Sequence, residues 1–233
     1  MGSGGTDREP VARAGWFVTG TGTEVGKTVV AAALARTAAA AGRRVAVLKP
    51  VETGVDEPGE PDHALLRRAA GSAQSDAEIA PYRYGPPVSP HLAAAAAGEA
   101  IEPAALVAAA ERAAASADVL VCEGVGGLLV PLRGSPDPWL VRDLAAALGL
   151  PLVLAAHPGL GTINHTLLTL EAARAAGLRV AAVVLTPWPR RPGEVERSNR
   201  ETVEALGDVP VAALPRLDLA RPEGWPPLDL PGA

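Results

Sequence analysis

The stretch GTGTEVGKT, residues 20–28, decides the fold of this chain. It follows an apolar run over 16–19 that predicts a strand, and it leads into an alanine-rich stretch over 27–41 that predicts a helix. A glycine-rich turn in this position is typical of a phosphate-binding loop, because its backbone N–H groups and the helix N-terminus can surround phosphate oxygens. The strict pattern has about four residues between Gly and Gly-Lys, whereas five separate Gly20 from Gly26 here. We therefore interpret the stretch as a variant loop with a longer turn.

The end of this loop carries the two side chains that phosphate chemistry needs. The Lys27 ammonium can reach the β- and γ-phosphates of a nucleotide, and the Thr28 hydroxyl can bind Mg²⁺. An ordinary strand–turn–helix connection requires neither residue. The loop therefore predicts a site for a nucleoside triphosphate and Mg²⁺.

Beyond the loop, short apolar runs alternate with helical stretches. Strands are predicted over 45–48, 119–122, 152–155, 180–185 and 211–214, and helices over 62–70, 103–115, 139–148, 161–175 and 193–206. A glycine-rich turn is predicted over 124–127, a loop over 51–61, and a largely irregular tail from Pro215. This alternation of strands and helices is typical of βαβ units. We therefore predict an α/β fold with a mostly parallel sheet flanked by helices on both faces, which is the Rossmann-like three-layer arrangement of P-loop NTPases. Residues 1–14 are expected to be a flexible leader and 15–233 a single P-loop domain.

Composition excludes several classes of protein. Of the 233 residues, 48% are hydrophobic and 20% are charged, which fits a chain with a core and argues against disorder. The net charge of −5 argues against a nucleic-acid-binding scaffold, and no apolar run reaches the roughly 18–20 residues of a membrane-spanning helix. The single cysteine, Cys122, excludes an intrachain disulfide and fits a small core residue in the reducing cytoplasm. We therefore expect neither nucleic acid nor membrane as a partner.

Lysine is scarce in this chain. Of its 21 basic residues, only Lys27 and Lys49 are lysines. Lys49 directly follows the strand predicted over 45–48, so it should lie with Lys27 at the carboxyl edge of the sheet, where open α/β sheets bind ligands. A compact ammonium suits places where the guanidinium fork of arginine does not fit. We interpret both lysines as facing phosphate or a developing anion; the alternative for Lys49 is an exposed lysine at a strand end.

Carboxylates near the same edge are candidate metal ligands. Glu123 ends the apolar strand over 119–122, the place where nucleotide-hydrolysing folds put an acid that organises magnesium. Asp56 and Asp62 both fall in or beside the loop over 51–61, and either is a possible metal partner. The four histidines show no metal-ligand spacing.

Together these motifs resemble the dethiobiotin synthetase family, the ATP-dependent ring-closing enzymes of biotin synthesis. The matching elements, in family order, are the loop at 20–28, KPVETG at 49–54, SPH at 89–91, VCEGVGG at 121–127 and GTINH at 161–165. The resemblance spans residues 16–217. It implies ATP and Mg²⁺, a homodimer, and 7,8-diaminononanoate with CO₂ or bicarbonate as substrates.

The resemblance also assigns roles to individual residues. It implies that Thr23, Lys27 and Lys49 are catalytic and that Thr28, Asp62 and Glu123 hold the metal. The nucleotide-binding residues that it implies are Glu24, Val25, Gly26, Lys27, Thr28, Val29, Asp62, Glu123, Gly124, Val125, Gly126, Thr186, Pro187, Pro215, Arg216 and Leu217. The substrate-binding residues are Thr53, Gly126, Gly127, Gly161, Thr162, Ile163 and Asn164. The last four resemble a helix start that takes the distal carboxylate of the substrate across a dimer interface.

One segment departs from the family pattern. Where the family often has an asparagine that reads adenine, this chain has TPWP at 186–189. Its prolines have no N–H donor, and no side-chain amide is present. We therefore expect a permissive base pocket that accepts nucleoside triphosphates other than ATP.

Rival functions fit the sequence less well. A partitioning ATPase needs an extra lysine near the start of the loop, where Thr21 and Gly22 stand, and a GTPase needs Asn-Lys-x-Asp, which neither lysine provides. A glutamine-dependent amide synthetase needs a glutaminase domain with a reactive cysteine, for which 233 residues with a single cysteine inside a predicted strand leave no room. A nucleotide-binding module without catalysis stays an open alternative.

Overall fold

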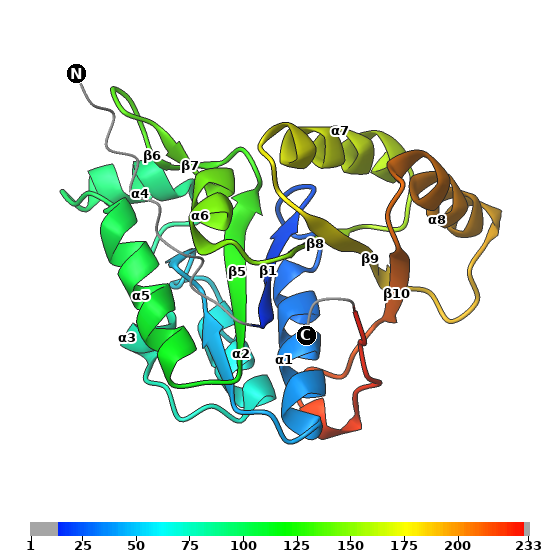
Figure 1. Ribbon diagram of the computed structural model, residues 1–233, viewed down its shortest axis with the longest axis horizontal. Helices are drawn as coiled ribbons and strands as arrows, with labels where there is room; N and C mark the ends of the chain where they lie inside the picture. The colour runs from blue at the N-terminus through cyan, green and yellow to red at the C-terminus, as the bar shows by residue number, and fades with distance from the viewer. Residues whose placement is uncertain (1–13, 231–233) are drawn as a thin grey trace.

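A six-stranded sheet forms the centre of the computed structural model, which describes residues 14–230 (Figure 1). Its strands are β1 (Gly15–Gly20), β2 (Val45–Leu48), β5 (Val119–Gly127), β8 (Leu152–Ala156), β9 (Val180–Trp188) and β10 (Val211–Pro215). They lie in the order β10-β9-β8-β1-β5-β2, and every neighbouring pair is parallel. The predicted parallel α/β architecture is confirmed. The expected leader over 1–14 lies, except for Ala14, outside the described residues, and the single domain over 15–233 stays a prediction.

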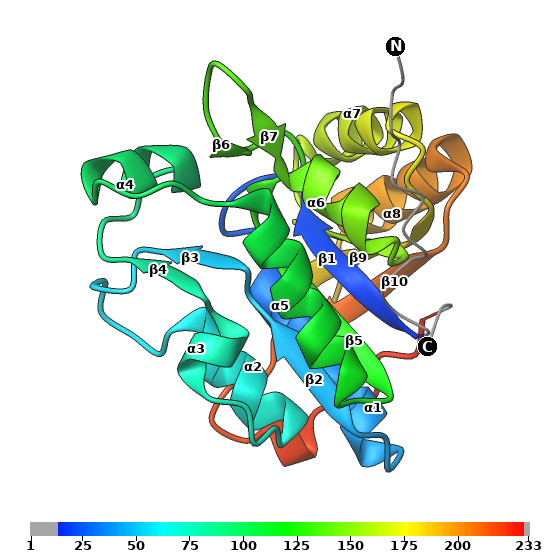
Figure 2. The same ribbon diagram turned by 60° about the vertical axis from the view of Figure 1, so that its left-hand side comes forward.

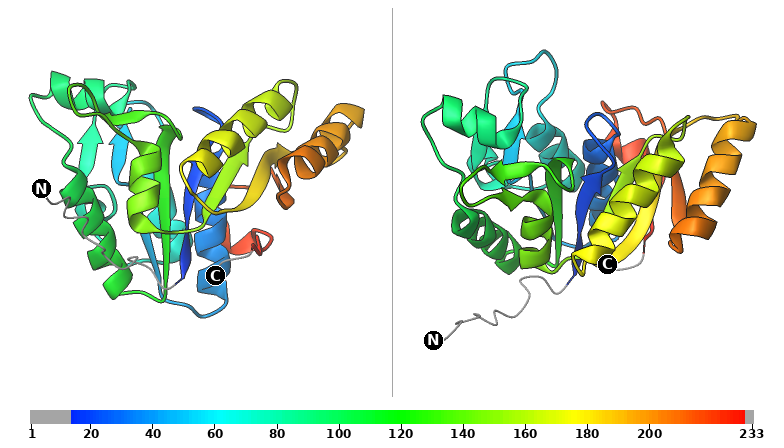
Figure 3. Two further views of the ribbon diagram at one scale, coloured as in Figure 1. Left: turned by 45° about the horizontal axis from the view of Figure 1, so that its top comes forward. Right: turned by 90° about the horizontal axis from the view of Figure 1, so that it is seen from above.

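Helices cover both faces of this sheet (Figure 2). On one face the strands pack against α5 (Pro103–Ala115), α6 (Val141–Leu148), α7 (Thr162–Ala175) and α8 (Glu194–Gly207). On the other face they pack against α1 (Lys27–Ala40) and α2 (Asp62–Ala70). Successive strand residues alternate between the two cores, with Phe17 in one and Val18 in the other, because side chains of a strand point to opposite faces. Figure 3 shows α7 and α8 side by side at one end of the molecule.

Smaller elements surround the carboxyl edge of the sheet. Two short strands, β3 (Val51–Thr53) and β4 (Tyr82–Tyr84), pair in parallel, and β6 (Pro131–Arg133) pairs antiparallel with β7 (Trp139–Leu140). The remaining helices are α3 (Asp76–Ile79), α4 (Pro90–Ala96) and the 3₁₀ turn η1 (Pro222–Gly224). Among them, Thr53 of β3, Pro90 of α4 and Val130 next to β6 line the site at the ends of β1, β2 and β5.

Four boundaries differ from the sequence prediction by two or more residues. The strand expected over 180–185 extends to Trp188 as β9. The glycine turn expected over 124–127 is part of β5, because this strand continues until Gly127 pairs with Gly20. The helix expected over 139–148 begins at Val141, because Trp139 and Leu140 pair with β6 and the Asp143 carboxylate accepts the Leu140 N–H at 2.7 Å. The loop expected over 51–61 begins with β3.

The tail after β10 packs against α1 and α2. Leu228 is buried there, and its N–H donates to the Thr37 hydroxyl at 2.9 Å. The Arg68 guanidinium donates to the Leu219 carbonyl at 2.7 Å. The tail therefore brings Leu219 to the rim of the site. Within residues 14–230, no helix has the length and apolar character that crossing a membrane requires.

Candidate functional site

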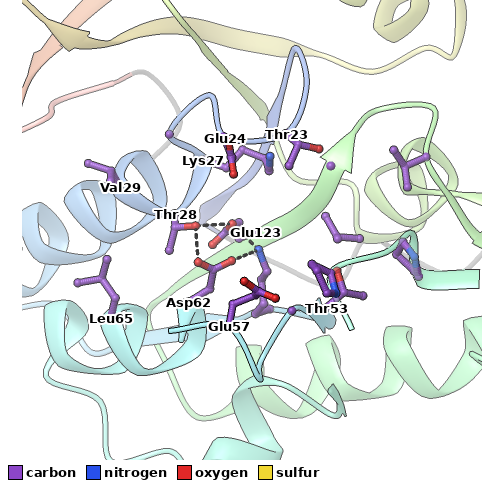
Figure 4. A pocket seen from close by; sticks show the side chains of 18 of the residues that line it. Thr23, Glu24, Lys27, Thr28, Val29, Thr53, Glu57, Asp62, Leu65 and Glu123 are labelled. Atoms are coloured by element: carbon purple, nitrogen blue, oxygen red, sulfur yellow. Dashed lines mark hydrogen bonds and ion pairs between the residues drawn. The ribbon is translucent and has the colours of Figure 1, made fainter. Parts of the chain in front are cut away.

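A pocket of about 680 Å³ opens where β1, β2 and β5 end (Figure 4). The residues predicted from the sequence that line it are Thr23, Glu24, Gly26, Lys27, Thr28, Val29, Lys49, Thr53, Asp62, Glu123, Val125 and Gly126. They come from the phosphate loop, the first turn of α1, the residues after β2, the start of α2, and β5. The topology of the parallel sheet brings these distant segments together at one edge.

The loop between β1 and α1 has the backbone of an anion-binding turn. Gly26, the N-cap of α1, has φ 91°, and a Cβ there would lie 2.6 Å from Cγ2 of Thr186. Glu24 also has a positive φ, 58°, which is uncommon for a residue with a side chain. Such turns aim successive N–H groups inward. Both the left-handed backbone and the contact with Thr186 therefore require glycine at position 26.

Lys27 is folded into this loop. It is the first residue of α1 and is 7% exposed, and its Nζ donates to the Gly22 carbonyl at 2.8 Å. Burial lowers the pKa of Lys27, and the nearby Lys49 charge lowers it further, whereas Glu123 raises it. The loop thus holds a desolvated cation whose charge an anionic phosphate would stabilise.

Thr28, Asp62 and Glu123 meet directly below the loop. Thr28 Oγ1 lies 2.9 Å from Asp62 Oδ1 and 2.9 Å from Glu123 Oε1 (Figure 4). Asp56, the other candidate from the sequence, lies elsewhere: its Oδ2 is 2.0 Å from the position that a Cβ on Gly85 would occupy. The geometry therefore favours Asp62 over Asp56 as a metal partner.

Lys49 joins the same cluster as a buried ion pair. Its Nζ lies 2.5 Å from Glu123 Oε1 and 2.7 Å from Asp62 Oδ2. Burial acts to lower the pKa of Lys49, but the charges of Glu123 and Asp62 outweigh it and raise the pKa, so the ammonium stays charged at neutral pH. Burial raises the pKa of the Glu123 carboxyl to about 7, and Lys49 limits that rise. Lys49 thus helps to keep Glu123 ionised.

This cluster has the chemistry of a magnesium site. Glu123 Oε2 is buried and has no hydrogen-bond partner among the described residues, so it is available to a cation. Residues 14–230 contain no group of three or more His, Cys, Asp or Glu side chains that could hold a metal. Mg²⁺ commonly takes only one or two protein carboxylates and completes its shell with water and substrate phosphates. Thr28, Asp62 and Glu123 therefore fit Mg²⁺ bound together with a nucleotide.

Several predicted nucleotide residues lie outside the lining of this pocket. These are Val25, Gly124, Thr186, Pro187, Pro215, Arg216 and Leu217, and Gly127 of the substrate set lies outside it too. Thr186 is buried at the end of β9 with its methyl group beside Gly26. Pro215 ends β10 and pairs with Trp188. The ends of β9 and β10 thus lie next to the phosphate loop on the side away from Lys49.

The residues from Gly161 to Asn164 form the start of α7. Gly161 is the N-cap with φ 91° and makes no side-chain cap. The Thr162 N–H donates to the Gly159 carbonyl at 3.3 Å, so the N–H groups that follow it in the first turn are the ones that can meet an anion. The buried Asn199 side chain holds the preceding loop by donating to the carbonyls of Pro158 at 2.9 Å and Gly159 at 3.0 Å. Leu160, in the same loop, is 98% exposed. The loop before this helix is therefore attached to α8, and the helix start lies outside the lining of the pocket.

Part of the pocket wall was missed by the sequence analysis. The additional lining residues are Glu57, Glu60, Leu65, Pro87, Val88, Val130 and Leu219. Pro87 and Val88 directly precede the SPH motif, which is the one signal that could have found them. Leu65 and Leu219 carry no chemical signal, because the packing of α2 and of the tail brings them to the site.

Comparisons with known proteins find relatives that cover most of the chain. Residues 14–223 match a protein-family model described as an AAA domain. A protein named ATP-dependent dethiobiotin synthetase BioD from Rhodococcus erythropolis is 45% identical over 202 residues, which cover 85% of this chain and 86% of that protein. One of the same name from Mycobacterium avium is 47% identical over 196 residues, covering 82% and 83%. Among solved structures, a nucleotide-binding protein in complex with ADP from Archaeoglobus fulgidus aligns with 90% of this chain and 84% of its own chain. The sequence identity is 16% and the TM-score is 0.48, so this similarity is too distant to bear on the site.

Proposed function

Because the chain belongs to the family of ATP-dependent dethiobiotin synthetases, and is therefore an ATP-dependent ligase of biotin synthesis, we propose that the pocket beside its phosphate loop joins CO₂ to 7,8-diaminononanoate and closes the ureido ring of dethiobiotin. The observation that carries the proposal is the position of Lys27 and Lys49. They are the only lysines of the chain, and both line this one pocket. The products are dethiobiotin, ADP and phosphate.

The proposed reaction has three steps. One amine of the diamine adds to CO₂ and loses a proton, which gives a carbamate. A carbamate oxygen then attacks the γ-phosphorus of ATP, ADP leaves, and a mixed carbamic–phosphoric anhydride forms. The second amine attacks the carbamoyl carbon and loses a proton, phosphate leaves, and the ring closes.

The two lysines address the main electrostatic problem of this reaction. A carbamate and a triphosphate repel each other, so cations must bring them together and stabilise the charge that develops between them. Lys27 lies in the phosphate loop, so we assign it to the γ-phosphate. Lys49 follows a different strand, and with Thr23 and Thr53 in the same pocket it is assigned to the carbamate. Gly126 lines the pocket too and supplies backbone groups on this side.

The metal assignment follows the buried oxygens below the loop. Thr28, Asp62 and Glu123 would hold Mg²⁺, which supplies positive charge to the phosphate oxygens when it is bound. Lys49 orients both carboxylates through its contacts at 2.5 and 2.7 Å.

The remaining assignments concern the two ends of the ligands. Glu24 and Val29 line the nucleotide side of the pocket, and Thr186, Pro187 and the residues from Pro215 to Leu217 are assigned to the base. The helix start at Gly161–Asn164 suits the distal carboxylate of the diamine. Because it lies outside the pocket lining and carries the exposed Leu160, we assign it to the pocket of a partner in a homodimer. A location in the cytoplasm stays a prediction.

A product assay tests the proposal. The purified protein is incubated with 7,8-diaminononanoate, bicarbonate, Mg²⁺ and ATP, and dethiobiotin is detected by mass spectrometry alongside ADP and phosphate. We expect ADP formation that requires the diamine and equals the dethiobiotin formed. ATP hydrolysis at the same rate with and without diamine, and no dethiobiotin, would indicate an ATPase switch instead. Sedimentation of the same preparation tests the dimer, and a monomer at all working concentrations would contradict it.

A further inference from the structure

We propose that Glu52 is a positioning residue for the metal site: with His63, it holds the first turn of α2 so that Asp62 faces Mg²⁺. Neither Glu52 nor His63 lines the catalytic pocket. The inference rests on the proposed function, because it assigns a role toward the metal of that same site.

Glu52 binds the start of α2 with both of its carboxylate oxygens. It lies on β3 and is 4% exposed. Its Oε1 accepts the backbone N–H of Asp62 at 2.7 Å. Its Oε2 lies 2.5 Å from Nδ1 of His63, the next residue of the helix. The carboxylate of one element thus fixes the first two residues of another.

The helix α2 needs such a contact because it has no cap of its own. Its N-cap is Pro61, which makes no side-chain hydrogen bond. The first N–H groups of a helix have no partner within it, and a negative charge is favoured at this end. Glu52 supplies both the acceptor and the charge, so it determines where Asp62 sits at the beginning of the helix.

His63 in turn keeps the Glu52 carboxylate in place. A buried charge is costly unless it is paired and hydrogen-bonded. A carboxylate oxygen only accepts, so the hydrogen of the imidazole lies on Nδ1 of His63. The other ring nitrogen lies 3.7 Å from Asp76 Oδ2, and Asp76 is paired with Arg67 at 2.5 Å. The hydrogen bond from Nδ1 to Glu52 is therefore the contact that orients the ring.

The position of Asp62 matters because both of its oxygens are in use. Oδ1 lies 2.9 Å from the Thr28 hydroxyl and Oδ2 lies 2.7 Å from the Lys49 ammonium. A shift of the first turn of α2 would disturb both contacts together. Partners that orient a metal ligand typically change metal affinity by about 10–100-fold when they are removed.

The test compares nucleotide binding with and without metal. Calorimetric titration with β,γ-imido-ATP is run in Mg²⁺ and in EDTA, and the ratio of the two affinities measures the contribution of the metal. We expect Glu52→Ala to reduce this ratio by about 10–100-fold and to leave the affinity in EDTA unchanged. Glu52→Gln should restore most of the ratio, because its amide oxygen accepts from Asp62 while its amide nitrogen donates to Nδ1 of His63 in the other tautomer.

Glu78→Ala is the matched control. Glu78 is also a carboxylate at a helix start: it lies in the first turn of the neighbouring helix α3 and accepts the N–H of the N-cap residue Ser75 at 2.7 Å. Its removal should lower the melting temperature without changing the affinity ratio. If Glu52→Ala does not fold, Glu52→Asp, which is one methylene shorter, is expected to reduce the ratio in the same direction.

Three results would overturn the inference: a wild-type ratio in Glu52→Ala or Glu52→Asp, an equal reduction in Glu78→Ala, or a wild-type affinity that does not depend on Mg²⁺. The dethiobiotin assay on the wild-type protein separates this inference from the proposed function. If the ratio changes as expected while no dethiobiotin forms, only the proposed function is wrong.

Discussion

The two lysines of this chain lie in one pocket but have different surroundings. Lys27 contacts a backbone carbonyl of its own loop, whereas Lys49 contacts two carboxylates from other elements. The contact of Lys27 suits a cation that binds a phosphate when a nucleotide is present. The contacts of Lys49 suit a cation that also orients the proposed metal ligands. Each lysine therefore has its own expected phenotype.

Lys27→Ala should abolish turnover and leave the fold intact. The loop cation is preorganised at the site of phosphoryl transfer, and removing such a group typically lowers the rate by about 10²–10³-fold. ADP release in the presence of diamine measures the rate, and circular dichroism and the melting temperature check the fold. A variant with nearly normal turnover would exclude Lys27 from the mechanism.

Lys49→Ala and Lys49→Arg should both cripple ring closure. Alanine removes the charge that faces the carbamate, and arginine replaces a compact ammonium with a wider planar fork. Nucleotide binding in EDTA without diamine should stay nearly unchanged, because the phosphate loop and Lys27 remain. Calorimetric titration with β,γ-imido-ATP beside a dethiobiotin assay separates the two effects. If Lys49→Ala loses nucleotide affinity as severely as Lys27→Ala, the division of roles is wrong.

Lys49 should also contribute to the stability of the folded protein. In Lys49→Ala, Asp62 and the buried Glu123 lose the cation that they share. Removing one member of a buried ion pair typically costs about 3–5 kcal/mol of unfolding free energy. Urea unfolding in EDTA should therefore show a loss on this scale, and Mg²⁺ should recover part of it. An unchanged unfolding free energy in EDTA would show that the pair is not buried as described.

The residues of the site could be predicted from the sequence only in part. The phosphate loop could be predicted because the spacing of its Gly, Lys and Thr residues is the one that phosphate binding requires. The choice between Asp56 and Asp62 came only from the family resemblance, because no local signal shows that the packing of α2 brings Asp62 to Thr28. The pairing of Glu52 with His63 was also hidden, because it depends on where β3 lies.

Among the elements, the ends of β9 and β10 determine the expected base selectivity. Thr186 packs against the phosphate loop, and Trp188 pairs with Pro215, so this backbone is fixed by its own contacts. The TPWP segment offers no side-chain amide to a base, so ATP, CTP, GTP and UTP should support dethiobiotin formation with similar KM values. A bidentate amide contact is worth about 1–3 kcal/mol. A preference for ATP above about 100-fold, near the upper end of that range, would contradict the permissive pocket.

At the opposite edge of the sheet, Asp118 joins the start of β5 to the residue before β2. The Arg44 side chain donates to it at 2.6 Å and the Arg44 backbone N–H at 2.9 Å. The side-chain hydrogen bond and then the backbone one lower the pKa of Asp118 from 3.8 to about 2. A lowered carboxyl pKa stabilises the fold above the unfolded pKa, and this contribution is lost as the pH falls toward the folded pKa.

Asp118→Asn should therefore be less stable than the wild type at neutral pH. The difference between their urea midpoints should be constant down to about pH 4 and should shrink between about pH 4 and pH 2, because wild-type Asp118 becomes protonated there. Parallel urea titrations of both proteins across this range measure the difference. A difference that is independent of pH would show that the Arg44 contact does not stabilise the folded state.

At the scale of the whole molecule, the sequence predicted the long elements and missed the short ones. The bounds of β2, α2 and α5 agree with the prediction, since strong local signals such as Pro103 and Gly71 mark helix ends. The pairings of β3 with β4 and of β6 with β7 involve two or three residues each and have no local signal. Thr53 of β3 and Val130 next to β6 line the pocket, so part of its wall depends on pairings that have no signal in the sequence.

The whole molecule brings the phosphate loop, Asp62, Glu123 and Lys49 together in one pocket, where we propose a phosphoryl transfer to a carbamate. In this reaction the attacking carbamate oxygen comes from CO₂ and leaves with the phosphate. The most direct test is a short reaction with ¹⁸O-labelled bicarbonate, the diamine, Mg²⁺ and unlabelled ATP, followed by mass spectrometry of the products. Phosphate that carries one ¹⁸O for each dethiobiotin formed is the result that this account predicts. Unlabelled phosphate, released together with dethiobiotin from fully labelled bicarbonate, would contradict it.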